Sequence, residues 1–136
     1  MKKFSLSAAV VALAVGGMAV PAMAHHSAAM FDMHKTVSIT GNVKEFQYTN
    51  PHSWLQVMTR DKNGKTVLWG FEAEGPSTLL RAGIKYSTFK PGMKVTVMGH
   101  PMKDGRPAAS LMSVKLPNGT VVHPFPVMPK KNKKSS

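Results

Sequence analysis

Histidine and methionine side chains gather near the front of the chain, where AHHSAAMFDMHK occupies positions 24–35. Imidazole nitrogens and thioether sulfurs bind transition metals, and the chain has no cysteine whose thiolate could take their place. On a mature chain starting at His25, the α-amine and ring Nδ1 of that residue could chelate one metal ion, and His26 would add an imidazole. Nitrogen ligands in a tetragonal arrangement suit Cu(II), and thioethers suit Cu(I). The pattern therefore predicts a copper site of His25 and His26, with four supplementary ligands: Met30, Met33, His34 and His52.

A leader sequence would create that N-terminus. Met1-Lys2-Lys3 is positively charged, residues 6–20 are apolar or small, and Ala22 and Ala24 place small side chains at −3 and −1 of a cleavage site. The apolar run is too short to be a good membrane span. We therefore predict a signal peptide at residues 1–24, cleavage after Ala24, export to the periplasm and no transmembrane segment in the mature protein.

The charge of the chain suggests a second kind of function. The formal net charge is +12, and +10 remains once the leader lysines are removed. Such an excess favours anionic partners, and export makes nucleic acid the poorest of them. The alternative to copper binding is therefore a metal-independent interaction module that docks an anionic envelope component or a partner protein. A basic tail that only aids solubility is a further interpretation, because four lysines lie there: Lys130, Lys131, Lys133 and Lys134.

The remaining 112 residues are enough for one small domain. We expect a His/Met arm at residues 25–35, a folded domain at 36–122, and a Pro/Lys-rich tail at 123–136. The tail lacks periodicity, so it is expected to be extended or disordered.

The domain has the pattern of β-strands. Apolar residues alternate from Val37 to Val43 and then shift phase to Phe46, which is typical of a β-bulge. Further strands are expected at residues 53–60, 65–73, 94–100 and 107–116, with an Asn63-Gly64 hairpin turn between the first two. A short helix is expected between Pro76 and Gly83. This order, β-β-β-α-β-β, predicts an all-β protein with one short helix: a small OB-fold-like barrel of five strands.

Several single residues have two interpretations. His52 follows Pro51 at the start of a strand, where it could face the arm as a ligand or simply form a hydrogen bond beside the turn. Trp54 lies on the opposite strand face from its apolar neighbours Leu55 and Val57, so its ring could be exposed as a surface on which bases or sugars stack. Packing in the core or at an edge is the preferred interpretation. His100 and His123 are expected to have structural roles, and four methionines are expected to fill the core: Met58, Met93, Met98 and Met112.

An enzyme is difficult to build from these residues. Glu72 and Glu74 share one face of a strand, but no motif pairs them with a nucleophile or a metal triad. There is neither a nucleophile elbow nor a phosphate-binding loop. We therefore predict that the protein is not an enzyme.

Six short motifs, taken together in their order and spacing, resemble those of a family of short exported bacterial proteins of unknown function. They are HHS at 25–27, NPHSW at 50–54, LWGFE at 68–72, LLRAG at 79–83, KPG at 90–92 and KDGRPAA at 103–109. The resemblance covers residues 25–119 and implies periplasmic export and a small OB-like barrel, without an activity. The chain departs from the family pattern at Ala28, where an aromatic residue is common, and at Met93, where an acidic residue is common.

Overall fold

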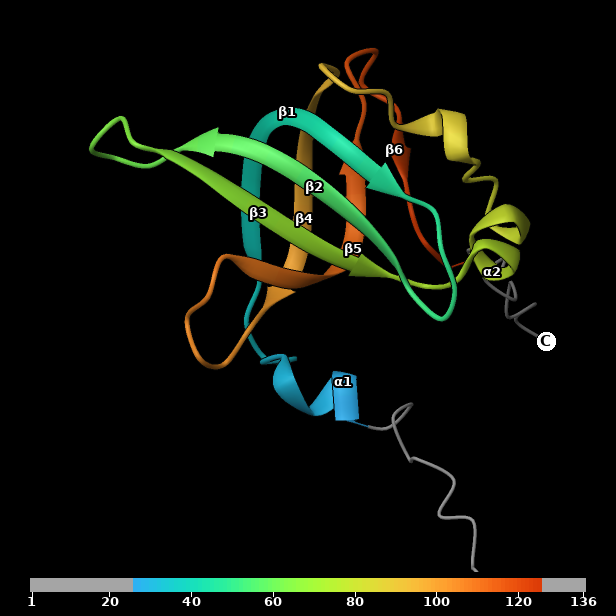
Figure 1. Ribbon diagram of the computed structural model, residues 1–136, viewed down its shortest axis with the longest axis horizontal. Coiled ribbons are helices and arrows are strands. Elements are labelled where there is room, and N and C mark those ends of the chain that lie inside the picture. Colours follow the sequence, from blue (N-terminus) through green and yellow to red (C-terminus); the bar gives the residue numbers. More distant parts are fainter. Residues whose placement is uncertain (1–25, 126–136) are drawn as a thin grey trace, which may run out of the picture.

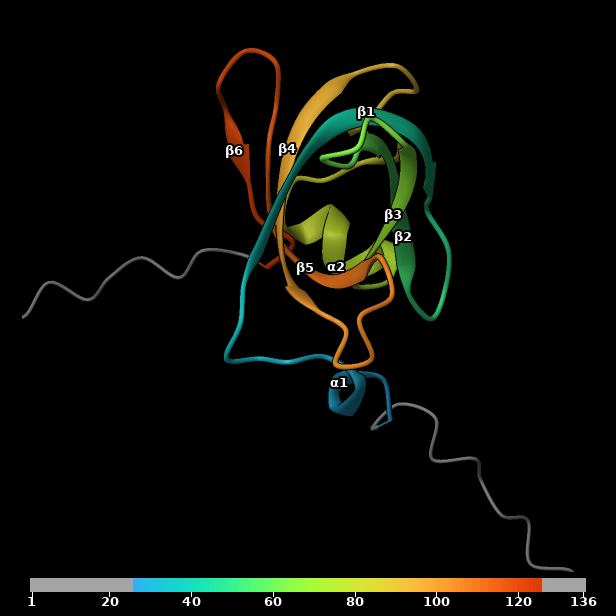
Figure 2. The ribbon, with the colours of Figure 1, turned by 90° about the vertical axis from the view of Figure 1, so that its left-hand side faces the viewer.

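The computed structural model describes residues 26–125. The elements are α1 (His26–Met30), β1 (Val37–Gln47), β2 (Ser53–Arg60), β3 (Thr66–Ala73), α2 (Pro76–Arg81), η1 (Tyr86–Thr88), β4 (Lys94–Pro101), β5 (Ala108–Lys115) and β6 (Val121–Val122). Four antiparallel pairings and one parallel pairing close a barrel in the order β3-β2-β1-β4-β5, with β5 returning to β3 as the parallel pair. Figure 2 shows this ring from its open side, and Figure 1 shows the barrel from the side.

The predicted OB-like barrel is confirmed, because the five long strands and the helix after β3 occur in the expected order. The structure adds three short elements to the predicted order: α1, the 3-10 turn η1, and β6, a two-residue strand that pairs with β5.

The long first strand serves two neighbours. Its first half pairs with β4 and its second half with β2, and the register shifts between Val43 and Glu45. That shift leaves Lys44 as the extra residue and confirms the bulge that the change of apolar phase predicted. At Gly41 the strand passes so close to β2 that an added Cβ would collide with the carbonyl group of Met58. A residue without a side chain is therefore needed where the strand bends.

The core lies inside the ring and at the end covered by α2. Phe71, Leu55, Val57 and Val97 are fully buried, and Leu79 of α2 is buried with them. Figure 2 shows α2 through the ring of strands. Burial alternates along β2 and β3, so one face of each strand contacts the core and the other faces outward.

The prediction that four methionines fill the core is wrong for three of them: Met98 is 40% exposed, and Met58 and Met112 are half-buried and do not belong to the core cluster. Met98 follows Val97 on β4, so strand alternation turns it outward. Met93 does pack against the core, and among residues 26–125 the one buried methionine is Met102, in the loop after β4.

Candidate functional site

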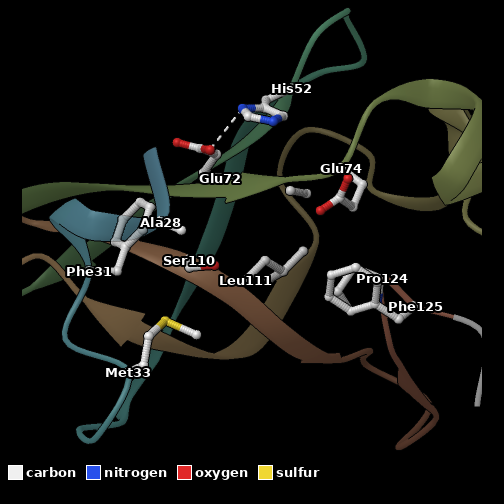
Figure 3. A pocket seen from close by; sticks show the side chains of 11 residues that line it. Ala28, Phe31, Met33, His52, Glu72, Glu74, Ser110, Leu111, Pro124 and Phe125 are labelled. Atoms are coloured by element: carbon white, nitrogen blue, oxygen red, sulfur yellow. Dashed lines mark ion pairs between the residues drawn. The ribbon is translucent and has the colours of Figure 1, made fainter. Parts of the chain in front are cut away.

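A cavity of about 290 Å³ lies between the arm and the barrel. It is called the His52 cavity below. Figure 3 shows His52, Glu72 and Glu74 on one side of it and Met33 on the other. Its walls come from α1 and the chain after it, from the ends of β2 and β3, from β5, and from the chain after β6: Ala28, Phe31, Met33, His52, Glu72, Ala73, Glu74, Ser110, Leu111, Pro124 and Phe125.

The shortest polar contact in the cavity joins two strand ends. His52 Nδ1 lies 2.8 Å from Glu72 Oε1, and the two side chains are 31% and 10% exposed. Glu74 is half-buried and lines the same cavity, and no salt bridge to it occurs among residues 26–125. In the cavity, the Glu72 carboxylate thus contacts an imidazole, whereas the Glu74 carboxylate has no cationic partner in the described part of the chain.

The register between β2 and β3 explains why these side chains share one side. Trp54 pairs with Glu72, and Ser53 pairs with Ala73. Ser53 and Ala73 are buried, so alternation turns His52, Glu72 and Glu74 to the opposite face.

The loop before β2 sets the position of His52. It contains a cis peptide bond between Asn50 and Pro51, and the Thr49 hydroxyl donates a hydrogen bond to the His52 carbonyl at 3.1 Å. The loop packs on Gly75, where an added Cβ would lie 2.9 Å from both Asn50 Oδ1 and the Pro51 carbonyl oxygen. Gly75 therefore lets the loop approach the end of β3, which carries Glu72.

The arm is held against the barrel by an apolar anchor. Phe31 is 3% exposed and forms an isolated antiparallel bridge with Met102. The backbone N–H of Asp32 donates to the Pro101 carbonyl at 2.8 Å, and that of Lys103 donates to the Met30 carbonyl at 2.9 Å. Figures 1 and 2 both place α1 beside the loop between β4 and β5. The arm is therefore a docked part of the domain over these residues.

A polar turn follows the anchor. Asp32 Oδ1 accepts a hydrogen bond from the His34 backbone N–H at 3.1 Å, and Oδ2 lies 3.4 Å from Lys35 Nζ. The backbone hydrogen bond is the main reason that the pKa of Asp32 is lowered, and Lys35 contributes in the same direction. The chain then turns into β1, with Met33 left at the cavity.

The structure brings together some of the predicted ligands and separates others. Met33 and His52 line the same cavity, whereas Met30 and His34 do not. All three of the arm residues Met30, Met33 and His34 are exposed, Met33 by 53%. His25 lies outside the described residues. His26 is the first residue of α1, and the position of its side chain is outside the described part of the structure.

Glu72 and Glu74 are the two acidic residues of the cavity, and neither is among the ligands predicted from the sequence. Two signals could have found them. The chain has only six acidic residues, and two of them stand two positions apart at a strand end. In addition, Arg60 pairs with Thr66 beside the hairpin loop, and continuing that register puts Trp54 opposite Glu72, next to His52.

Other residues with two interpretations have structural contacts. His100 Nδ1 lies 2.7 Å from the Lys35 carbonyl oxygen, so this histidine ties β4 to the end of the arm. Trp54 is half-buried and its ring covers Gly70 on β3. The segment expected to be a tail also begins within the fold, because Pro124 is buried and lines the His52 cavity.

The described residues contain no complete metal centre of their own. Between residues 26 and 125, histidine and acidic side chains do not gather in groups of three that could hold a metal ion. A metal ion bound at the cavity would therefore need donors from beyond these residues or from sulfur. In the same part of the chain, no helix combines the length and the apolar character needed to cross a membrane.

The strand order and the parallel β3–β5 closure define the protein as a small OB-like β-barrel, here with an N-terminal arm docked on it. The chain belongs to a family of unknown function, DUF6152, whose model matches residues 12–111. No curated protein and no solved structure matches the chain. The family membership agrees with the resemblance of the sequence to a family without an assigned activity.

Proposed function

We propose that this protein is an exported periplasmic binding protein whose mature N-terminus captures copper. Cleavage after Ala24 would free an α-amine on His25, and an α-amine has a typical pKa near 8, well below that of lysine. This amine and the His25 ring would chelate the ion, and His26 would supply another nitrogen. Copper has the highest affinity of the divalent first-row metals for such nitrogen ligands.

The observation that carries this proposal is the docked position of the arm. Phe31 fixes the arm beside the barrel, and Met33 and His52 consequently face one cavity. The first residue of α1 follows His25 directly in the sequence. Donors of three kinds (amine, imidazole and thioether) are therefore available within one short stretch and the cavity next to it.

The charge distribution supports a cation as the ligand. The chain carries a net charge of +12, yet two of its six acidic residues, Glu72 and Glu74, line this cavity. Carboxylates at a cavity attract a cation and disfavour an anion. The proposed role is storage, delivery or buffering of copper rather than catalysis.

The test is a Cu(II) titration of protein with an authentic His25 N-terminus, by calorimetry and EPR. The control carries three extra residues, Gly-Ser-Gly, before His25. One or two extra residues would put a histidine at the third position, where the amine, two backbone amides and an imidazole form a new Cu(II) site. One-to-one binding with nitrogen hyperfine structure that is lost in the control supports the proposal. Equal binding by both proteins contradicts it.

A basic surface gives the alternative function its own support. Two adjoining shallow depressions share Thr40 and Lys94, and one adds Arg60 while the other adds Lys115. An anionic envelope component or an acidic partner protein would fit this surface. Binding of this kind should weaken steeply with salt and with removal of residues 129–136. Copper binding should be unaffected by that truncation, which separates the two functions.

A further inference from the structure

We propose that the outer face of the barrel binds an acidic glycan, which is a chain of sugars that carry anionic groups. The site is a row of side chains across four strands, with cations at its two ends and threonine hydroxyls between them. This inference goes beyond copper binding, because it needs neither the arm nor a metal ion. It gives the alternative function a ligand class and a defined set of residues.

The row follows from the register of the strands. Thr40 of β1 pairs with Thr96 of β4, and Thr96 pairs with Lys115 of β5. On its other edge β1 pairs with β2 as far as Asn42, and continuing that register by two residues places Arg60 beside Thr40. Directly paired residues lie on one face of a sheet and neighbouring strands are about 4.8 Å apart, so the row from Arg60 to Lys115 is about 14 Å long.

Two adjoining depressions, of about 570 and 250 Å³, lie along this row. The larger one contains Arg60, the smaller one contains Lys115, and Lys94 lines both. These three cations are exposed, and none of them forms a salt bridge among residues 26–125. Arg60 Nη1 donates to the Gly64 carbonyl at 3.0 Å, and the other N–H groups of its guanidinium remain for a forked contact with a carboxylate.

The acidic side chains of residues 26–125 line neither depression. Asp61 follows Arg60 in the sequence, but its Oδ1 is turned into the hairpin loop. There it accepts hydrogen bonds from the backbone N–H groups of Asn63 and Lys65 at 2.8 and 2.9 Å. An anion at the row is therefore attracted by three cations without repulsion from a carboxylate in the lining.

Hydroxyl and amide groups form the floor between the cations. The hydroxyls of Thr40 and Thr96 share a hydrogen bond of 2.9 Å. Thr59 Oγ1 donates to the Thr40 carbonyl at 2.7 Å, and Asn42 Nδ2 donates to the Gly92 carbonyl at 3.0 Å. A hydroxyl has one donor and two acceptor sites, so the shared bond leaves both Thr40 and Thr96 able to bond a sugar hydroxyl.

The composition of the lining favours a sugar chain over other anionic partners. Nucleic acid bases stack on aromatic rings, whereas both depressions in the described structure are lined without an aromatic residue. A protein partner is usually anchored by large apolar side chains, and a lipid surface takes them up. The exposed large apolar side chains of residues 26–125 lie outside the two depressions. A polar chain that carries both hydroxyls and anionic groups matches this lining best.

The first experiment compares ligands. The mature protein, residues 25–136, is titrated by calorimetry with a galacturonate oligomer, which has a carboxylate and free hydroxyls on each sugar. Polyglutamate of the same charge and vesicles containing phosphatidylglycerol represent an acidic protein and a lipid surface. We expect the galacturonate oligomer to bind at least about tenfold more tightly than either, because the floor adds hydrogen bonds to its hydroxyls. Equal or weaker binding of the galacturonate oligomer overturns the inference.

The second experiment locates the charges that bind. Arg60→Gln, Lys94→Gln and Lys115→Gln should each weaken binding of the galacturonate oligomer by about 3- to 10-fold, because each removes one charge-assisted contact at an exposed site. Lys103→Gln is the matched control, since Lys103 is an exposed lysine that lines neither depression. An equal loss in Lys103→Gln would assign the binding to the total charge of the chain and overturn the inference.

The third experiment tests the floor. Thr40→Val keeps the size of the side chain and removes its hydroxyl, so it should weaken binding of the galacturonate oligomer and leave binding of polyglutamate unchanged. Thr40→Ser should restore the binding. Urea unfolding shows whether each variant is folded, and Thr96→Val replaces Thr40→Val if that variant is not. Unchanged binding of the galacturonate oligomer by the folded valine variant reduces the site to charge alone and overturns the assignment to a glycan.

The outcomes separate this inference from the functions proposed above. If removal of residues 129–136 abolishes binding and the substitutions in the row do not change it, the anionic partner binds the tail and only the inference fails. If the wild type binds none of the anionic probes, the alternative function fails together with the inference. The copper titration is independent of these results, because the row contains no residue of the proposed copper site.

Discussion

Phe31 of the arm and Met102 of the loop after β4 pair across an antiparallel bridge, and both side chains are buried. Their contact joins two segments that lie far apart in the sequence. It brings the front of the chain to the end of the barrel where His52 and Glu72 meet. The position of the candidate site thus depends on an apolar contact that involves none of its polar groups.

Replacing this anchor should release the arm. We expect Phe31→Ala to lower the free energy of unfolding by about 3 kcal/mol, the lower part of the range for a buried phenylalanine, because the arm can detach from an intact barrel. Urea unfolding measures the loss, and hydrogen exchange of residues 28–34 shows where it occurs. Met30→Ala is the control, since the Met30 side chain is 43% exposed. Equal effects of the two substitutions would show that Phe31 is not the anchor.

Filling the space at Gly75 should displace His52. An added methyl group would press on Asn50 and Pro51, and we expect Gly75→Ala to cost about 1–3 kcal/mol, the range for overpacking. The loop can relieve the contact by moving away from β3, which would separate His52 from Glu72. Denaturant unfolding measures the loss of stability, and the chemical shifts of the His52 ring report its separation from Glu72. Ser77→Ala, an exposed position on α2, is the control, and unchanged His52 ring shifts in Gly75→Ala would contradict the prediction.

The bend of β1 offers a test of the fold. Gly41→Ala would drive a Cβ into the carbonyl group of Met58, a backbone group that cannot rotate away. We expect a loss of more than about 2 kcal/mol of stability, because either the β1–β2 pairing or the bulge must distort. Gly70→Ala is the matched control in a strand, since its added Cβ would meet only the Trp54 ring at an ordinary 3.5 Å. Thermal and urea unfolding should show a clearly larger loss of stability for Gly41→Ala than for Gly70→Ala. Similar losses would show that the close approach of Gly41 to the Met58 carbonyl does not restrict the residue at this position.

The polar turn of the arm predicts a pH dependence. The pKa of Asp32 is lowered from its usual value of 3.8, chiefly by the hydrogen bond from the His34 backbone N–H. Because the folded-state pKa is the lower one, the carboxylate stabilises the docked turn above the unfolded pKa, and this contribution is lost as the pH falls through the lowered value. A ¹³C titration of the Asp32 carboxyl group should therefore give a midpoint below 3.8. Lys35→Ala should raise that midpoint only in part, since Lys35 is not the main cause. A midpoint at or above 3.8 in the wild type would contradict the docked turn.

Much of the fold could be predicted because its determinants are local. Alternating apolar residues gave the strands, and the phase shift between Val43 and Phe46 gave the bulge, since each depends only on which side a residue faces. The hairpin loop was equally predictable, and it fixed the pairing of β2 with β3. The exposure of Met98 differs from the prediction because its position next to the buried Val97 on β4 turns an apolar side chain outward.

The candidate site was predictable only in its separate parts. By itself the sequence determined that a cysteine-free chain carries histidine and methionine near its front, that His52 starts a strand, and that Glu72 and Glu74 share a strand face. Only the tertiary structure decided that Glu72 would hold His52, and that Met33 rather than Met30 or His34 would share their cavity. The reason is physical: side-chain type and strand parity are properties of neighbouring residues, whereas these contacts depend on how closely Gly75 lets a loop approach and on where Phe31 is buried.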